Sequence, residues 1–295
     1  MRNEVVWVKR KLFAFLMSII LVMSLPVTAS ADIGPKPSVR IQFTGIEGET
    51  YYGTLLSELR STGPATAWDG YEDYRDWKPE NEKPIWEKFI SYEDTDGYYF
   101  LQEWWDCSET NQLNWTYYPP NPFKILLYFP ETDSFYVSDI YERYAFDSYF
   151  TVDLSAYATT PITARQSYDY TWELISLAAR IVLTIALELG IALLFGYREK
   201  KVLTLLALVN IVTQVTLNVA LNIINYNSGS MSFTFSYVLF EILVFAIEAV
   251  AYAVLLKKFS CKEQKKGRAV GYAFVANAAS FAFGLWLAHV IPGIF

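Results

Sequence analysis

Long runs of apolar residues fill the C-terminal part of the chain and are separated by short polar loops. Each run contains about 20 residues, which is the length of helix that crosses a hydrocarbon core of about 30 Å. Residues 171–295 are therefore expected to form a transmembrane domain, a bundle of four helices. The predicted spans are residues 172–195, 202–224, 236–256 and 269–291.

The N-terminus and the loop charges predict how this domain is oriented. Residues 1–31 have a basic start, an apolar run and the small residues Ala29-Ser30-Ala31, the pattern of a signal peptide cleaved before Asp32. The loops that join the first span to the second and the third to the fourth are rich in Lys and Arg, so they are expected in the cytoplasm. We expect a multi-pass plasma-membrane protein with residues 32–170 and the C-terminus extracytoplasmic.

Polar residues recur inside the spans at the spacing of one helix face. In the second span Asn210, Gln214, Asn218 and Asn222 are four residues apart, so they share a face. Because amides and carboxyls would lack partners in lipid, one such stripe on every helix predicts a polar interior. The other polar residues are Arg180, Thr184 and Glu188 in the first span, Thr213 in the second, Glu241, Glu248 and Tyr252 in the third, and Asn277 and Ser280 in the fourth.

Depth along the helices, at about 1.5 Å per residue, divides these residues into two layers. In the outer layer Arg180 and Glu241 are expected to form a structural ion pair, because a base beside an acid lowers the cost of burial. The inner layer has two acids, Glu188 and Glu248, and no base, so at least one acid is expected to be protonated at neutral pH. The predicted intramembrane polar cluster is Glu188, Asn210, Thr213, Gln214, Glu248, Asn277 and Ser280.

The segment before the first span, residues 32–170, has the pattern of a β-rich domain. Residues 39–43 alternate apolar and polar side chains and, with residues 51–56, are expected to form a hairpin. Residues 123–129 and 134–138 are richer in β-formers and flank a turn sequence. Several short strands at this spacing predict a small antiparallel sandwich. The chain is therefore expected to be an α+β membrane protein of two domains.

Charge and histidine content exclude several functions. Residues 32–169 hold 24 Asp and Glu against 10 Lys and Arg, which argues against nucleic acid as a partner and suits a solvated domain. The only histidine is His289, so the exported segment has no Ser-His-Asp site and no His-containing zinc site. Cys107 and Cys261 are expected on opposite sides of the membrane and cannot pair.

One loop has acids at several positions of an EF-hand calcium loop, from Tyr92 to Glu103. Its first position should be Asp and is Tyr92, and the sequence after it has the pattern of a strand. A hairpin turn is the better explanation, and we expect no metal and no cofactor.

Aromatic residues gather before the proline-rich stretch at 119–122. Such clusters stack on sugars or anchor partner proteins, and they also fill cores. The sequence leaves both roles open. The residues are Trp104, Trp105, Trp115, Tyr117 and Tyr118.

Four stretches of the chain resemble a group of uncharacterised predicted membrane proteins from Gram-positive bacteria. They are Asp32-Ile33-Gly34-Pro35-Lys36-Pro37-Ser38, Tyr52-Gly53-Thr54-Leu55-Leu56-Ser57, Val209-Asn210-Ile211-Val212-Thr213-Gln214 and residues 241–248. The resemblance implies the same arrangement of signal peptide, exported domain and helices. It implies no activity.

Three functions remain open from the sequence. The first is transport or sensing through a protonatable bundle coupled to the exported domain; since four helices are few for a transporter, this function implies a homo-oligomer. The second is an envelope interaction protein that binds an envelope protein or wall polymer and uses its helices only as an anchor in the lipid bilayer. The third is an intramembrane enzyme that uses Glu188 and Glu248, although the sequence favours a non-enzymatic function.

Overall fold

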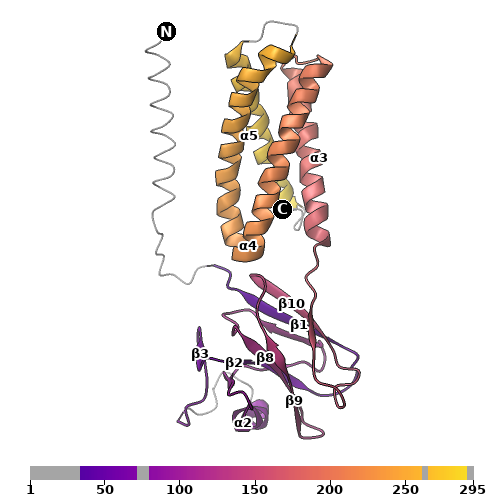
Figure 1. Cartoon of the computed structure of the whole chain (residues 1–295), viewed down its shortest axis with the longest axis vertical. Helices are drawn as coiled ribbons and strands as arrows, with labels where there is room; N and C mark the ends of the chain where they lie inside the picture. The colour runs from indigo at the N-terminus through magenta and orange to yellow at the C-terminus, as the bar shows by residue number, and fades with distance from the viewer. Residues whose placement is uncertain (1–33, 72–79, 261–264, 291–295) are drawn as a thin grey trace. The chain divides into compact units, whose positions relative to one another are not determined.

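The computed structural model describes residues 34–71, 80–260 and 265–290 (Figure 1). The predicted signal peptide, Cys261 and the side chain of His289 lie outside what is described. Among the described residues, a β-rich region comes first and long helices follow. The predicted order of the two regions is confirmed.

One sheet of the β-rich region contains four strands in the order β11-β10-β1-β7. Strand β1 pairs in parallel with β10 and antiparallel with β7. The alternation predicted for β1 is present, because Val39, Ile41 and Phe43 are buried while Arg40 is exposed. The bounds are β1 (Ser38–Thr44), β7 (Gln112–Trp115), β10 (Asp147–Asp153) and β11 (Ala164–Gln166).

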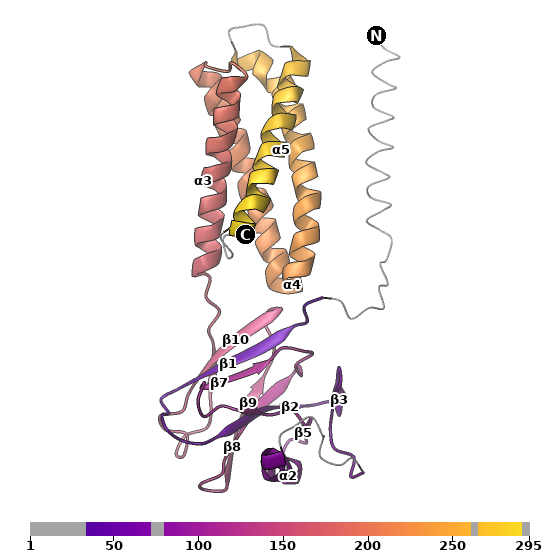
Figure 2. The same cartoon turned by 180° about the vertical axis from the view of Figure 1, so that it is seen from behind.

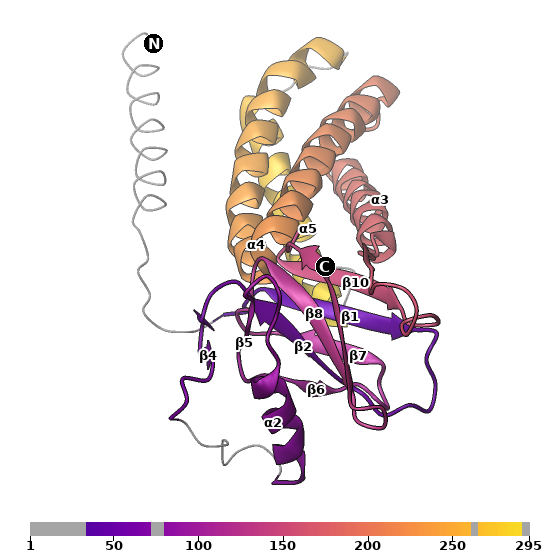
Figure 3. The same cartoon turned by 60° about the horizontal axis from the view of Figure 1, so that its bottom comes forward.

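A second, antiparallel sheet has the order β5-β2-β8-β9, with β6 also paired to β2. Every residue of β8 is buried, because both faces of this strand are covered. Phe123 and Ile125 face a core shared with the first sheet, whereas Leu126 and Tyr128 pack with Phe89 of the short helix α2. Helix α2 is labelled at the bottom of Figure 3. The bounds are β2 (Tyr52–Ser57), β5 (Tyr99–Phe100), β6 (Trp105–Asp106), β8 (Phe123–Phe129), β9 (Ser134–Tyr141) and α2 (Lys83–Ser91).

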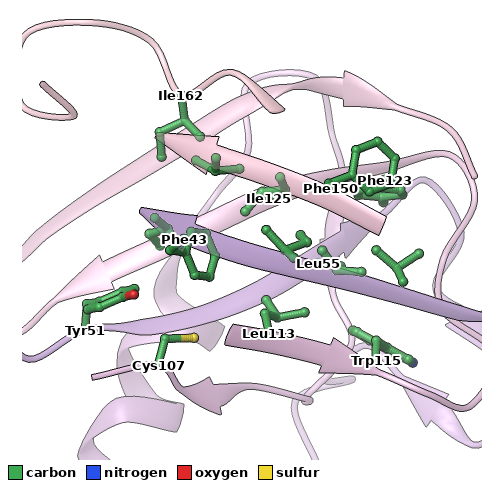
Figure 4. Packing of buried hydrophobic residues seen from close by; sticks show 14 of the residues in the cluster. Phe43, Tyr51, Leu55, Cys107, Leu113, Trp115, Phe123, Ile125, Phe150 and Ile162 are labelled. Atoms are coloured by element: carbon green, nitrogen blue, oxygen red, sulfur yellow. The ribbon is translucent and has the colours of Figure 1, made fainter. Parts of the chain in front are cut away.

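Apolar side chains from both sheets meet in one core, seen in Figure 4. Phe43, Leu55, Leu113, Phe123 and Phe150 come from five different strands, and each is at most 2% exposed. Burial of one such side chain contributes about 1.5–3 kcal/mol, so this core is the main stabilising feature of the β-rich region. Three short elements among the described residues come between β2 and α2 in the sequence. They are the paired strands β3 (Ser61–Thr62) and β4 (Ala65–Thr66) and the 3-10 turn η1 (Glu80–Glu82).

The two predicted hairpins had different outcomes. Strands β8 and β9 pair across the predicted turn, so that hairpin is confirmed. The hairpin of residues 39–43 with 51–56 is wrong, because β1 and β2 belong to different sheets. The expectation of wholly antiparallel pairing is also wrong, since β1 and β10 are parallel. The turn between β1 and β2 does not make these two strands pair with each other. Strand β1 pairs instead with β10, about 110 residues later in the sequence.

The helical region consists of α3 (Thr171–Leu194), α4 (Lys200–Phe259) and α5 (Lys266–Val290), which pack side by side (Figure 2). The uncharged loop expected at residues 225–235 is helical except at Gly229, whose φ of 79° and ψ of 176° break α4 into two halves. The halves run back along each other, because Asn210 and Thr213 of the first half hydrogen-bond to Tyr252 and Glu248 of the second. The expectation of a longer loop is corrected to a single non-helical residue.

Apolar side chains cover the outside of the helical region. Val182, Leu194 and Val250 are 65%, 86% and 62% exposed, whereas Glu188 and Glu248 are fully buried. All three helices are long and apolar enough to cross a membrane. A polar interior inside an apolar surface suits a lipid environment, in which an exposed apolar side chain costs nothing and an exposed amide lacks partners.

The break in α4 contacts the loop between β9 and β10. The Phe146 N–H donates a hydrogen bond to the Tyr226 carbonyl at 2.8 Å, and the Tyr226 ring packs near those of Tyr144 and Tyr168. A Cβ at Gly229 would lie 2.6 Å from the Phe146 ring. Glycine is therefore needed here for its backbone conformation and for the close approach of this ring.

Candidate functional site

Seven buried polar residues of the helical region form one hydrogen-bonded group, which we call the carboxylate network. Each member is at most 9% exposed. They come from α3, both halves of α4 and α5, so all the helical segments contribute. The members are Glu188, Asn210, Thr213, Glu248, Tyr252, Asn277 and Ser280.

Glu188 of α3 is held by two neutral donors. The Asn210 amide donates to Oε2 at 2.6 Å, and the Ser280 hydroxyl donates to Oε1 at 3.2 Å. The Tyr272 hydroxyl donates to the Glu188 backbone carbonyl at 3.2 Å. Glu188 is therefore positioned by side chains from α4 and α5.

Glu248 of α4 is held in the same manner. The Thr213 hydroxyl donates to Oε1 at 2.7 Å, and the Asn277 amide donates to Oε2 at 2.8 Å. The Tyr252 hydroxyl, one helical turn from Glu248, also hydrogen-bonds to this carboxylate. These contacts join the two halves of α4 to α5.

Tyr252 connects the two carboxylates. The Asn210 amide that donates to Glu188 also lies 3.1 Å from the Tyr252 hydroxyl oxygen, and the Tyr252 hydroxyl hydrogen-bonds to Glu248. A path of hydrogen bonds therefore runs from Glu188 through Asn210 and Tyr252 to Glu248. A change in the protonation of one acid can alter the polarity of the whole path.

Two acceptors of the carboxylate network have no hydrogen-bond partner among the described residues. They are the Oδ1 atoms of Asn210 and Asn277, whose side chains are 1% and 5% exposed. Both amides point their nitrogens at a carboxylate, so two open oxygens lie beside two acids. Buried acceptors are normally satisfied, and a group that brings a proton or positive charge would satisfy these.

Every described side chain that hydrogen-bonds to Glu188 or Glu248 is neutral. Unpaired buried charges cost several kcal/mol each, and amides and hydroxyls offset only part of this cost. The arrangement therefore suits carboxyls that carry a proton, or that share a bound cation, when the site is at rest.

Arg180, Asn218 and Glu241 lie outside this network. The Arg180 guanidinium donates to Asn218 Oδ1 at 3.3 Å and lies over the Phe233 ring, while Glu241 hydrogen-bonds to Tyr237. The direct ion pair of Arg180 with Glu241 stays a prediction.

Gln214 contacts Asn218 and so lies with the residues outside the carboxylate network. Asn218 donates to the Gln214 backbone carbonyl at 2.8 Å, and its amide lies 3.4 Å from Gln214 Oε1. Six of the seven residues predicted for the polar cluster contact one another or a shared carboxylate, and Gln214 is the exception.

Two tyrosines of the site were not among the predicted site residues. Tyr252 was placed on the polar face of its helix without a role, and its position one turn after Glu248 was the available signal. Tyr272 was missed; it lies eight residues before Ser280 on α5, which is the spacing of one helix face. Tyrosine contributes both a large apolar ring and a hydroxyl, so its polar role is hard to recognise inside an apolar run.

The acidic loop from Tyr92 to Glu103 is a turn closed by a lysine. Lys124 Nζ of β8 lies 2.8 Å from Asp94 and 2.5 Å from Asp96. Burial opposes the charge of Lys124, but its hydrogen bonds to both acids outweigh this and raise the pKa of the ammonium group. The ammonium thus occupies the place between two acids that a calcium ion would need, and among the described residues no group of three or more His, Cys, Asp or Glu could hold a metal.

The aromatic cluster is divided between core and surface. Trp104 and Trp115 are 4% and 3% exposed, whereas Tyr117 and Tyr118 are 38% and 39% exposed. The tryptophans therefore stabilise the fold, and the two tyrosines are the members accessible to a partner.

Comparisons of the chain with protein families, with curated proteins and with solved structures found no match.

Proposed function

We propose that this chain is a multi-pass bacterial plasma-membrane protein that binds and releases a proton or monovalent cation at the carboxylate network, in transport or in sensing. Its helical segments form a four-helix bundle, and its β-rich region is an acidic sandwich displayed outside the cell after removal of a signal peptide. The resemblance to predicted membrane proteins of Gram-positive bacteria supports this assignment of compartment.

One observation carries the proposal. Glu188 and Glu248 are fully buried, every described side chain that hydrogen-bonds to them is neutral, and the Oδ1 atoms of Asn210 and Asn277, which have no partner among the described residues, lie beside them. A purely structural network would leave neither two acids without a base nor two acceptors unsatisfied. Intramembrane acids that face a bundle interior commonly mark proton or ion pathways.

Four other titratable residues of the helical region lie around the carboxylate network, but none of them neutralises Glu188 or Glu248 by an ion pair that the described residues show. Tyr252 and Tyr272 contact the network from α4 and α5, and Glu241 and Arg180 belong to the group on the outer side. The tyrosines supply hydroxyl donors. A change in the charge of Glu188 or Glu248 would therefore alter hydrogen bonds made by residues of all the helical segments.

The contact at the break in α4 supplies the coupling to the β-rich region. Tyr226 and Gly229 are in the same helix as Asn210 and Glu248, and they touch Phe146 of the β9–β10 loop. A shift between the halves of α4 when the network gains or loses a proton would move this contact. The β-rich region could then report the state of the network, or control it.

The test is an infrared titration of the protein in lipid bilayers from pH 5 to 9. We expect a protonated carboxyl band at neutral pH that weakens in Glu188→Gln and Glu248→Gln and disappears in the double variant. Glu131→Gln is the matched control, since Glu131 is exposed at the β8–β9 turn. Carboxyls that are fully ionised throughout would overturn the proposal.

Proteoliposomes then separate transport from sensing. In transport, an imposed pH gradient decays faster with the wild-type protein than with the double variant, because Gln cannot release a proton. In sensing, the infrared band titrates without proton flux. If the double variant keeps all the cellular functions of the wild-type protein, both transport and sensing are contradicted. The helices would then serve only as an anchor, as expected for an envelope interaction protein.

A further inference from the structure

An arginine of the β-rich region differs from Lys124 in having no described acid paired with it. Arg143, in the loop between β9 and β10, is half-buried, and its Nε has no hydrogen-bond partner among the described residues. No described residue forms an ion pair with its guanidinium. Burial lowers the pKa of Arg143, although an arginine still carries its charge at neutral pH.

Cavities lie on two sides of Arg143. One has a volume of about 230 Å³ and includes Ser57, Glu58 and Tyr118 in its lining, and the other has a volume of about 320 Å³ and includes Tyr144. Asn121 and Arg143 line both. Arg143 is therefore half-buried and borders both cavities.

Two neighbours of Arg143 in the smaller cavity, Asn121 and Ser57, can donate hydrogen bonds. The Arg143 backbone N–H donates to Asn121 Oδ1 at 2.8 Å, so the nitrogen of that amide is left to donate. The Ser57 hydroxyl oxygen accepts from the Leu59 N–H at 3.0 Å, and its own proton can donate elsewhere. The Lys36 ammonium lies 5.5 Å from the centre of the Tyr118 ring, which lines this cavity.

We propose that the smaller cavity, whose lining includes Arg143, Asn121, Ser57 and Tyr118, binds a phosphate group. A guanidinium fork matches phosphate oxygens in bidentate geometry, and a tetrahedral phosphate accepts from donors in several directions. The phosphate is either free in solution or part of an anionic lipid headgroup. The site is independent of the carboxylate network, because no residue is shared.

Glu58 sets a limit on this site. It is the acid among the residues that line the smaller cavity, and the surrounding region is strongly acidic. Both oppose the binding of an anion, so removal of the Glu58 charge should strengthen the binding of phosphate.

The experiment titrates inorganic phosphate into the full-length protein in nanodiscs of zwitterionic lipid, with tyrosine fluorescence and calorimetry as readouts. We expect saturable binding that Arg143→Gln weakens about 10- to 100-fold, the loss expected for a charge-assisted hydrogen-bonding group. Arg165→Gln removes an exposed arginine of β11 and should leave the affinity unchanged. Equal affinities of Arg143→Gln and the wild-type protein, or no saturable binding, would overturn the proposal.

Glu58→Gln keeps the proposal testable if Arg143→Gln does not fold. This variant should bind phosphate about two- to fivefold more tightly, the scale of one exposed charge interaction; unchanged or weaker binding counts against the site. Nanodiscs with phosphatidylglycerol identify the source of the phosphate. If the headgroup occupies the cavity, this lipid lowers the apparent affinity for free phosphate, whereas a site for free phosphate keeps its affinity.

Discussion

The two regions of this chain bury opposite kinds of side chain. In the β-rich region Phe123 and Phe150 are inside, and exposed positions such as Glu131 are charged. In the helical region Glu188 is inside, and exposed positions such as Val182 are apolar. Buried polar groups need hydrogen-bond partners in both regions. The opposite distribution of polar and apolar side chains therefore indicates different surroundings: water for the β-rich region and lipid for the helical region.

The two regions also treat a buried charge differently. Lys124 is buried in β8 and pairs directly with Asp94 and Asp96, so the protein itself neutralises it. Among the described residues, the side chains that hydrogen-bond to Glu188 and Glu248 are all neutral. The first arrangement stabilises a turn, and the second is the feature on which the proposed proton or cation site rests.

The largest expected effect tests the inversion itself. Phe123→Ala removes a fully buried ring from the core and should lower the free energy of unfolding by about 3–5 kcal/mol. Phe235→Ala, at a position of α4 that is 67% exposed, should change stability in bilayers by less than about 0.5 kcal/mol. Thermal unfolding of both variants measures the contrast, and equal losses would show that the helical region does not face lipid.

The contrast in buried charge is tested at Lys124. Lys124→Met leaves Asp94, whose side chain is fully buried, without its cation, and should cost about 2–3 kcal/mol. The pKa of Lys124 is raised in the fold, so its contribution is complete below the unfolded pKa of about 10.4 and is lost as pH rises through the folded value. Stability measured from pH 7 to 11 should fall above pH 10 in the wild-type protein, and this part of the fall should be absent in the variant.

The contact between the regions is tested at Gly229. Gly229→Ala places a Cβ at a φ of 79° and 2.6 Å from the Phe146 ring, which should cost about 1–3 kcal/mol. Gly190→Ala is the matched control, because nothing lies within 4 Å of a Cβ there; in a helix interior this change should stabilise by up to about 1 kcal/mol. If the two variants unfold at the same temperature, the break at Gly229 is not needed.

The smallest expected effect is an absence of labelling. Burial raises the pKa of Cys107 to about 12, and the side chain is fully buried, so a membrane-impermeant thiol reagent should not modify it in folded protein. Any label must then be on Cys261, which is predicted in the cytoplasm and should react only after permeabilisation. Labelling of Cys261 in intact cells would reverse the proposed orientation, and Cys261→Ser identifies its signal.

Local patterns were enough for the order of the two regions and for the hairpin of β8 and β9. In both cases the information lies within a few residues: a run of apolar side chains, or two strands on either side of a short turn. One polar stripe on each span likewise predicted that Asn210, Glu248 and Asn277 face a common interior. In the structure Asn210 hydrogen-bonds to Glu188, and Asn277 to Glu248. That the network acts on protons stays a prediction.

The sequence by itself determined which stretches are apolar, where acids interrupt them and which strands are joined by a tight turn, because these depend on near neighbours. Only the tertiary structure decided that β1 pairs with β10, that Lys124 meets Asp94, and that Tyr252 joins Glu188 to Glu248. These contacts link residues up to about 110 positions apart. They arise because packing selects, among many chemically acceptable partners, the ones that fill a core and satisfy buried polar groups together.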